Sequence, residues 1–271
     1  MANTATQAKA TSPYARPSVS RTKATVKPGK IPVKVDHLIT EDDTPVDNLF
    51  SEKQQRLLTE PLYSSWHPAK TNGKRKPRKF LAAANVGVFC HNKTPKAAIV
   101  PDVFISMDVA PSKHWHAKEH RSYFIWEFGK APELVIEVVS NRKGGELTTK
   151  PKKYARCGIS FYVVFDPTHA LGKQTLRLYE LYAGTYVQRT HKWFPQLDLG
   201  LTLWQGTYED VEETWLRWCD EDGKIIPTGA ERADGQAARA DEEAARADEE
   251  AARADALAEK LRALGMDPDQ L

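Results

Sequence analysis

Hydrophobic residues in this chain form short runs separated by polar turns, a pattern typical of β-strands. Four such runs, rich in valine, isoleucine, phenylalanine or alanine, cover residues 80–90, 99–107, 133–140 and 160–166. The last three are mostly continuous apolar segments, as expected of central strands that are covered on both faces. The segment between the last two runs is polar and is predicted to be helical in its middle, which indicates a right-handed strand–helix–strand crossover.

Helical and hairpin patterns flank these runs. Ser51 and Gln54 have the spacing of a capping box, so the pattern predicts a helix over 51–60 that ends before Pro61. Later alternating segments read "QTLRLYELY", "TYVQRT", and "WLRWCD" turning through "EDG" to "KII". They predict hairpins at the edge of the domain. This order of elements indicates an α/β fold with a mixed β-sheet flanked by helices.

The two ends of the chain differ in composition from its middle. Residues 1–44 are interpreted as a disordered basic arm and linker, because their first thirty positions contain Lys and Arg but no Asp or Glu. Residues 229–271 hold a heptad repeat of alanines with Glu and Arg four positions apart. The repeat predicts a charged, alanine-rich helix, either solvated on its own or paired in the coiled coil of a homodimer. Residues 45–228 remain as one folded domain.

Composition excludes several classes of protein. The 271 residues are 41% hydrophobic, which is enough for one sizeable core. No apolar run approaches the roughly 18–20 residues that span a bilayer, and the first residues lack the apolar core of a secretory signal, so no membrane partner is expected. Cys90, Cys157 and Cys219 lie far apart without a CxxC pattern, which favours reduced thiols in a cytoplasmic protein.

Two of the apolar runs are each interrupted by one acid. Asp102 lies in "PDVFIS" and Glu137 lies in "LVIEVVS". Ionised carboxylates are rarely buried unless they are paired or bind a metal, so the two acids are either structural ion-pair residues or parts of one site. Two carboxylates with waters and a phosphate oxygen suit Mg²⁺, with Mn²⁺ as a possible substitute. Such a metal makes phosphodiester hydrolysis feasible near neutral pH.

These residues carry a resemblance to a known family. The segments "PDVFIS" and "LVIEVVSNRKGGELTTKPKKYARCGISFYVVFDP" resemble the Uma family of restriction endonucleases, within the PD-(D/E)XK nuclease superfamily, over roughly residues 48–220. The resemblance implies a restriction-endonuclease-like fold and a metal-dependent site that cleaves DNA. It implies that Asp102 and Glu137 are the metal ligands, that Lys150 is the catalytic lysine, and that Glu146 is an additional acid of the site.

The sequence departs from the superfamily pattern at two positions. Val139 stands where a lysine usually follows the second acid, and the family places its lysine on the following helix, at Lys150. Pro151 follows that lysine directly, so the helix is predicted to begin near Thr149 or to kink. Lys153 is the fallback cation.

Other polar residues are weaker candidates. Glu52, on the first predicted helix, is either an auxiliary metal ligand or an exposed acid. The basic stretch 70–79 is either a DNA-contacting loop or a solvated one, and its candidate phosphate contacts are Lys74, Arg75, Lys76, Arg78 and Lys79. The segment "HWHAKEH" is interpreted as a surface loop, since a zinc site would need a fourth ligand. Its aromatic neighbours Trp115, Tyr123 and Trp126 are interpreted as packing residues.

The sequence thus favours a Mg²⁺-dependent endonuclease whose partner is DNA. The alternative is a nucleic-acid-binding or assembly module that kept the nuclease scaffold and lost turnover, which Val139 and Pro151 motivate. A glycosidase with two catalytic acids fits less well, because the acids lie on neighbouring strands in basic surroundings.

Overall fold

The structure is a computed structural model that describes residues 48–68, 78–93, 98–114, 116–141 and 144–264. The N-terminal arm predicted over residues 1–44 lies outside the described residues, as do the three candidate DNA contacts Lys74, Arg75 and Lys76. Across these ranges, no helix combines the length and the apolar character needed to cross a membrane.

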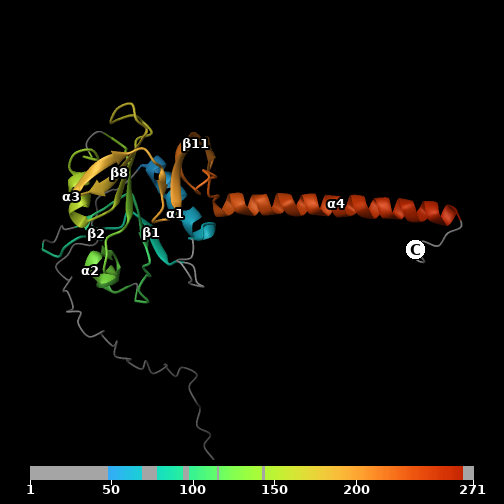
Figure 1. Cartoon of the computed structure of the whole chain (residues 1–271), viewed down its shortest axis with the longest axis horizontal. Coiled ribbons are helices and arrows are strands. Elements are labelled where there is room, and N and C mark those ends of the chain that lie inside the picture. Colours follow the sequence, from blue (N-terminus) through green and yellow to red (C-terminus); the bar gives the residue numbers. More distant parts are fainter. Residues whose placement is uncertain (1–47, 69–77, 94–97, 115, 142–143, 265–271) are drawn as a thin grey trace, which may run out of the picture. The chain divides into compact units, whose positions relative to one another are not determined.

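A six-stranded sheet forms the centre of the fold (Figure 1), with the strand order β1-β4-β6-β7-β8-β9. The strands span Phe80–Ala84 (β1), Val103–Met107 (β4), Leu134–Val138 (β6), Phe161–Phe165 (β7), Leu176–Tyr182 (β8) and Thr185–Arg189 (β9). β6 and β7 are parallel, whereas the other neighbours are antiparallel. The predicted α/β fold with a mixed, restriction-endonuclease-like sheet flanked by helices is therefore confirmed.

Two small sheets and several helices complete the domain. One small sheet has the order β10-β11-β12 and the other has the order β3-β2-β5. Their bounds are Trp193–Phe194 (β10), Leu199–Tyr208 (β11), Val211–Cys219 (β12), Val88–Phe89 (β2), Ala98–Ile99 (β3) and Tyr123–Phe124 (β5). The helices are α1 (Leu49–Ser64), α2 (Ile125–Phe128), α3 (Lys150–Cys157), α4 (Gly229–Ala263) and the short 3-10 helix η1 (Lys118–His120).

Alternation along the central strands divides the core between the two faces of the sheet. On β6, Leu134, Ile136 and Val138 pack with α1 and with the β10-β11-β12 sheet. Val135, on the opposite face, packs with Tyr154 of α3. Each face of the sheet is thus covered, which explains why the central strands are almost continuously apolar.

Helix α1 differs at both ends from the sequence prediction. Its N-cap is Asn48, whose side chain accepts from the backbone N–H of Ser51 at 2.9 Å, so the predicted Ser51–Gln54 capping box is wrong. Gln54 instead lies buried and pairs with the backbone of Leu216 on β12 through two hydrogen bonds. The helix also continues through Pro61, which lies on its buried face, to Ser64, so the predicted end before Pro61 is wrong.

The outer edge of β1 is closed by a side chain of α1. Tyr63 donates its hydroxyl hydrogen to the carbonyl oxygen of Ala82 and accepts from the N–H of the same residue, both at 2.9 Å. Ala82 is the middle residue of β1, so its two outward backbone groups are satisfied without a further strand.

The strand–helix–strand crossover predicted from the sequence is present as β6, α3 and β7, with β6 and β7 paired in parallel. Helix α3 begins at Lys150, and Pro151 lies in its first turn, where a proline removes no helical hydrogen bond. Gly158 ends the helix in a left-handed conformation with a φ of 75°.

The cysteines contradict the sequence prediction of three reduced thiols. Cys90, which follows β2, is joined by a disulfide to Cys157 at the end of α3, while Cys219 is free and buried. The fold brings the two Cα atoms to 5.2 Å across 67 residues, which is within disulfide range. Spacing along the sequence carries no sign of this proximity, and the thiol argument for a cytoplasmic location no longer holds.

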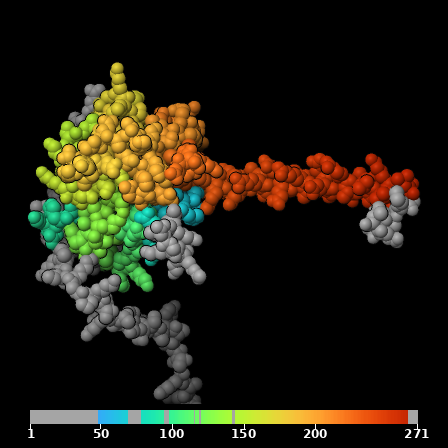
Figure 2. Space-filling model, viewed as in Figure 1, coloured from blue at the N-terminus to red at the C-terminus, as the bar shows by residue number. Residues whose placement is uncertain are grey.

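Helix α4 contains the alanine repeat. A capping box starts it, in which Thr228 accepts from the N–H of Glu231 and the Glu231 carboxylate accepts from the N–H of Thr228. The same carboxylate pairs with Arg217 of β12 at 2.6 Å, which fixes the first turn of the helix. None of the helix residues is buried, and Figure 2 shows their side chains exposed along it. The coiled coil and the homodimer remain predictions.

Candidate functional site

The two acids picked out from the sequence face each other on neighbouring strands. β4 and β6 are antiparallel and pair Val103 with Ile136, so continuation of this register puts Asp102 across from Glu137. Glu137 alternates with Ile136, which packs on the α1 side, so its side chain points to the α3 side. Asp102 alternates with Val103 in the same way, and both acids therefore belong to one face of the sheet.

Backbone and side-chain donors hold the carboxylate of Asp102. Its Oδ2 accepts from the N–H of Val138 at 2.6 Å, and its Oδ1 accepts from Nε2 of Gln55 at 3.5 Å. Gln55 is oriented in turn by Asn85, whose Nδ2 donates to its Oε1 at 2.8 Å. Helix α1 thus contributes to the position of this carboxylate at the start of β4.

Glu137 is fully buried and receives two hydrogen bonds from α3. The ammonium of Lys150 lies 2.8 Å from its Oε2, and the hydroxyl of Tyr154 donates to its Oε1 at 2.5 Å. Burial raises the pKa of Glu137 to about 8, and the negative charge of Asp102 acts in the same direction, while Lys150 and Tyr154 act against it. Burial also raises the pKa of Tyr154 well above its usual range, so its hydroxyl is a donor at neutral pH.

Lys150 connects Glu137 with a second buried acid. Its Nζ lies 3.2 Å from Oε1 of Glu146, one helical turn earlier in the chain. Burial disfavours the charged form of Lys150, but Glu137, Glu146 and Asp102 outweigh it and raise the pKa of the lysine. The lysine is thus a fixed cation beside the two facing acids.

The residues present fit a divalent metal with oxygen ligands. Oε2 of Glu146 is buried and has no hydrogen-bond partner, and a side chain at Gly144 would occupy the space of the Glu146 carboxylate. The negative charge of Asp102 adds to burial in raising the pKa of Glu137. A divalent cation bound between the two acids would lower that pKa again. Among the described side chains, no group of three or more His, Cys, Asp or Glu residues is arranged to hold a metal. Two carboxylates completed by water and phosphate oxygens would match the ligand set of Mg²⁺.

The chemistry that this arrangement supports follows from its charges. A divalent ion held by Asp102 and Glu137 would polarise a phosphoryl oxygen and lower the pKa of a bound water. Lys150 can orient an attacking water or neutralise negative charge that develops on the phosphoryl group. Tyr154 helps to fix the position of the Glu137 carboxylate, because its hydroxyl donates to that carboxylate and its side chain is fully buried.

The remaining predicted residues are placed less centrally. Lys153 is exposed on α3, and Lys150 is the lysine of this helix that contacts the acids. Glu52 forms an ion pair with Arg56 at 2.9 Å on the outer side of α1. Arg78 pairs with Asp108 at 2.8 Å, and this contact raises the pKa of the arginine. Lys79 is exposed immediately before β1.

Sequence reasoning missed three residues of the site. Gln55 was not considered, although it lies one helical turn from Glu52 and occupies the position that reaches Asp102. Asn85 has a φ of 54°, which suits an asparagine in a turn, but only the fold brings it to Gln55. Tyr154 lies four residues after Lys150, a spacing that predicts a shared helix face and could have identified it.

The raised pKa of Glu137 makes the stability of the metal-free protein depend on pH. The unfolded carboxyl releases its proton near 4.5, whereas the folded one releases it near 8, so between these values the folded state binds more protons. Stability is therefore expected to be greatest below the lower value and to fall as the pH rises through the higher one, by on the order of 1 kcal/mol per pH unit. Urea denaturation at several pH values with a chelator present measures this slope.

The variant Glu137→Gln is the control for the pH experiment. Glutamine keeps the shape of the side chain and cannot ionise, so the fall in stability between pH 5 and pH 8 should flatten. An unchanged slope in Glu137→Gln would assign the pH dependence to other groups.

Comparison with known proteins identifies a family that matches this chain. A family model named Uma2, with the description "Putative restriction endonuclease", matches residues 43–209. The match covers more than half of the chain and includes Asp102, Glu137, Glu146 and Lys150. No curated protein and no solved structure matches this chain.

Proposed function

Because this chain belongs to the Uma2 family of restriction endonucleases, we propose that it is a metal-dependent endonuclease that hydrolyses phosphodiester bonds in DNA. Asp102 and Glu137 hold a Mg²⁺ ion, which Mn²⁺ can replace, and Lys150 positions the attacking water or stabilises the transition state. The observation that carries the proposal is the contact of Lys150 with Glu137 at 2.8 Å, beside an aspartate on the neighbouring strand.

The missing lysine of the superfamily pattern motivated the alternative of an inactive scaffold. Val139 stands at that position and is buried in the core on the α3 side of the sheet. The ammonium that reaches Glu137 comes from Lys150 at the start of α3, so a cation stands beside the acid although the usual position is apolar. This placement favours the endonuclease over the inactive module.

Cleavage assays test the proposal. We expect the purified protein to cut plasmid and linear DNA with Mg²⁺ or Mn²⁺ and not with a chelator. Asp102→Asn and Glu137→Gln should each slow cleavage at least about 100-fold, because each removes a ligand charge from the site. Glu212→Gln, which changes an exposed acid on β12, serves as the matched control and should cut at the wild-type rate.

Binding measurements separate the two functions. An inactive module would bind DNA in a salt-dependent manner that the chelator does not change, and its wild type would cut no better than Asp102→Asn. Calorimetric titration with Mn²⁺ supplies an independent readout, since the aspartate variant should lose the metal whether or not DNA is present. Cleavage that survives in both acid variants would contradict the proposed site.

A further inference from the structure

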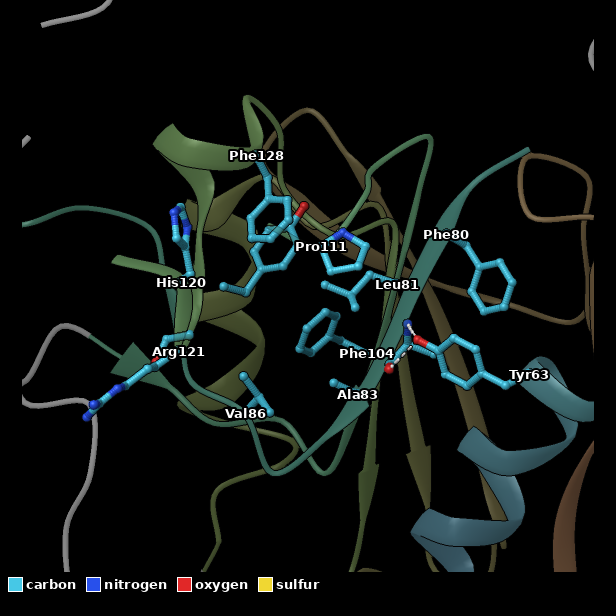
Figure 3. A pocket seen from close by; sticks show the side chains of 13 residues that line it. Tyr63, Phe80, Leu81, Ala83, Val86, Phe104, Pro111, His120, Arg121 and Phe128 are labelled. Carbon is cyan, nitrogen blue, oxygen red and sulfur yellow. Dashed lines mark hydrogen bonds between the residues drawn. The ribbon is translucent and has the colours of Figure 1, made fainter. Parts of the chain in front are cut away.

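A hollow of about 480 Å³ opens between β1 and the segment that leads from β4 to α2. One wall is formed by Leu81 and Ala83 of β1, the floor by Phe104 of β4, and the opposite wall by Pro111 and Phe128. Figure 3 shows these side chains around the opening, with Arg121 and His120 at its far rim. We call this the aromatic hollow.

The aromatic hollow lies on the same face of the sheet as the facing acids. Leu81, Ala83 and Phe128 pack with the core on the α3 side, to which Phe104 belongs. Phe104 is two residues after Asp102, which directly precedes β4, so the two side chains point to one side about 7 Å apart along the chain. A ligand in the aromatic hollow would therefore be a neighbour of any phosphate held by the acids.

The lining suits a flat, apolar group. Leu81, Ala83 and Phe128 are only partly buried, and contiguous apolar surface of this kind typically marks a binding site. The ring of Phe128 stacks on Tyr123 with centroids 4.2 Å apart and planes 5° apart, which fixes its orientation. Tyr123 is thus a packing residue, as the sequence indicated, and it supports an aromatic wall.

The charges around the aromatic hollow suit an anionic ligand backbone. Among the described residues that line it, none is Asp or Glu. Arg121 carries a positive charge at the rim, where its side chain extends away from the opening and donates to the carbonyl oxygen of His116 at 3.3 Å (Figure 3). Lys79, which directly precedes the lining residue Phe80, is exposed and carries a positive charge at the start of the wall strand. Apolar and aromatic walls with basic surroundings are the features that single-stranded nucleic acid uses, through base stacking and phosphate contacts.

We propose that the aromatic hollow accepts a nucleobase that has left the base stack, next to the phosphate at the candidate cleavage site. This inference rests on the proposed function for its substrate class, DNA, and adds that the protein acts on unpaired or extruded nucleotides. Stacking on Phe128 holds the base.

Fluorescence of 2-aminopurine tests the proposal in the absence of cleavage. Full-length protein is titrated, with a chelator present, into single-stranded DNA and into duplex DNA that carry the fluorescent base at one position. We expect quenching on single strands if the base stacks in the aromatic hollow, and a rise in duplex fluorescence if the base is extruded first. Binding without any change of fluorescence in either DNA would overturn the proposal.

Two variants change the aromatic hollow in opposite ways. Phe128→Ala removes the stacking ring, whereas Ala83→Leu fills the space and removes no packing contact, so the second remains informative if the first unfolds. Each is expected to weaken binding of single-stranded DNA about 5- to 100-fold. Tyr182→Ala, which removes an aromatic ring that is 76% exposed on β8, is the matched control and should bind as wild type.

The outcomes distinguish this inference from the proposed function. If wild type cuts DNA but both variants of the aromatic hollow bind and quench as wild type, the base site is wrong and the nuclease stands. If no cleavage occurs but both variants lose quenching while still binding Mn²⁺, the base site stands and the nuclease fails. Loss of self-association in these variants, with DNA binding intact, would assign the aromatic hollow to a second copy of the chain and overturn the proposal.

Discussion

Replacing Lys150 by methionine is expected to slow DNA cleavage by about 10²- to 10⁴-fold and to lower the free energy of unfolding by about 3 kcal/mol. Methionine keeps the apolar stem but removes the ammonium that lies 2.8 Å from Glu137 and 3.2 Å from Glu146. The stability cost is at the lower end for a buried ion pair, because the lysine side chain is 27% exposed and Glu137 can take up a proton. Single-turnover cleavage and urea denaturation measure the two effects.

Two further variants isolate the role of this lysine. Lys153→Met removes an exposed ammonium from the same helix and should change neither quantity. Glu137→Gln combined with Lys150→Met should recover at least about 1 kcal/mol of the lost stability, because glutamine replaces the buried acid that Lys150→Met leaves without its cation. The double variant should not recover cleavage. A wild-type rate in Lys150→Met would exclude the lysine from catalysis, and loss of cleavage in Lys153→Met alone would move the role to that residue.

Removal of the Cys90–Cys157 disulfide is expected to lower stability by about 4 kcal/mol. The bond closes a segment of 67 residues, so its loss enlarges the set of unfolded conformations. It also frees the end of α3, the helix that brings Lys150 and Tyr154 to Glu137, and cleavage should fall together with stability. Guanidinium denaturation of wild type and Cys157→Ser, each with and without reductant, measures the change.

Cys219 supplies the control for the disulfide. Its thiol is free and buried, so Cys219→Ser should leave the sensitivity to reductant unchanged. Wild type and Cys157→Ser should become equal once reductant is present. Equal stability of the two proteins without reductant would show that the bond does not restrain the unfolded chain.

The central strands and the facing acids could be predicted because each has a local signal. Apolar runs of strand length identified β4, β6 and β7, and a single acid in a run is unusual enough to mark Asp102 and Glu137. The helix between β6 and β7 followed from the length of the polar connection, and its late start followed from Pro151. Local signals of this kind survive in a single sequence.

Features that depend on distant contacts could not be predicted. The link from Gln55 to Asp102 joins residues 47 positions apart, and the disulfide joins residues 67 positions apart, so neither leaves a pattern in a short window. The continuation of α1 through Pro61 depends on packing of its buried face, which outweighs the propensity of one residue. The long β11–β12 hairpin was also missed, since only part of its second strand was recognised.

The hydroxyl of Tyr63 on Ala82 has a consequence for self-assembly. An open strand edge can act as a template on which another molecule adds its own strand, and this is a common beginning of fibrils and precipitates. At the middle of β1, the outward N–H and C=O of Ala82 already bond the hydroxyl of Tyr63. A side-chain hydroxyl offers no strand edge to which a further strand could pair. Stacking of copies through this rim of the sheet is therefore disfavoured, and any ordered assembly has to be built from another surface.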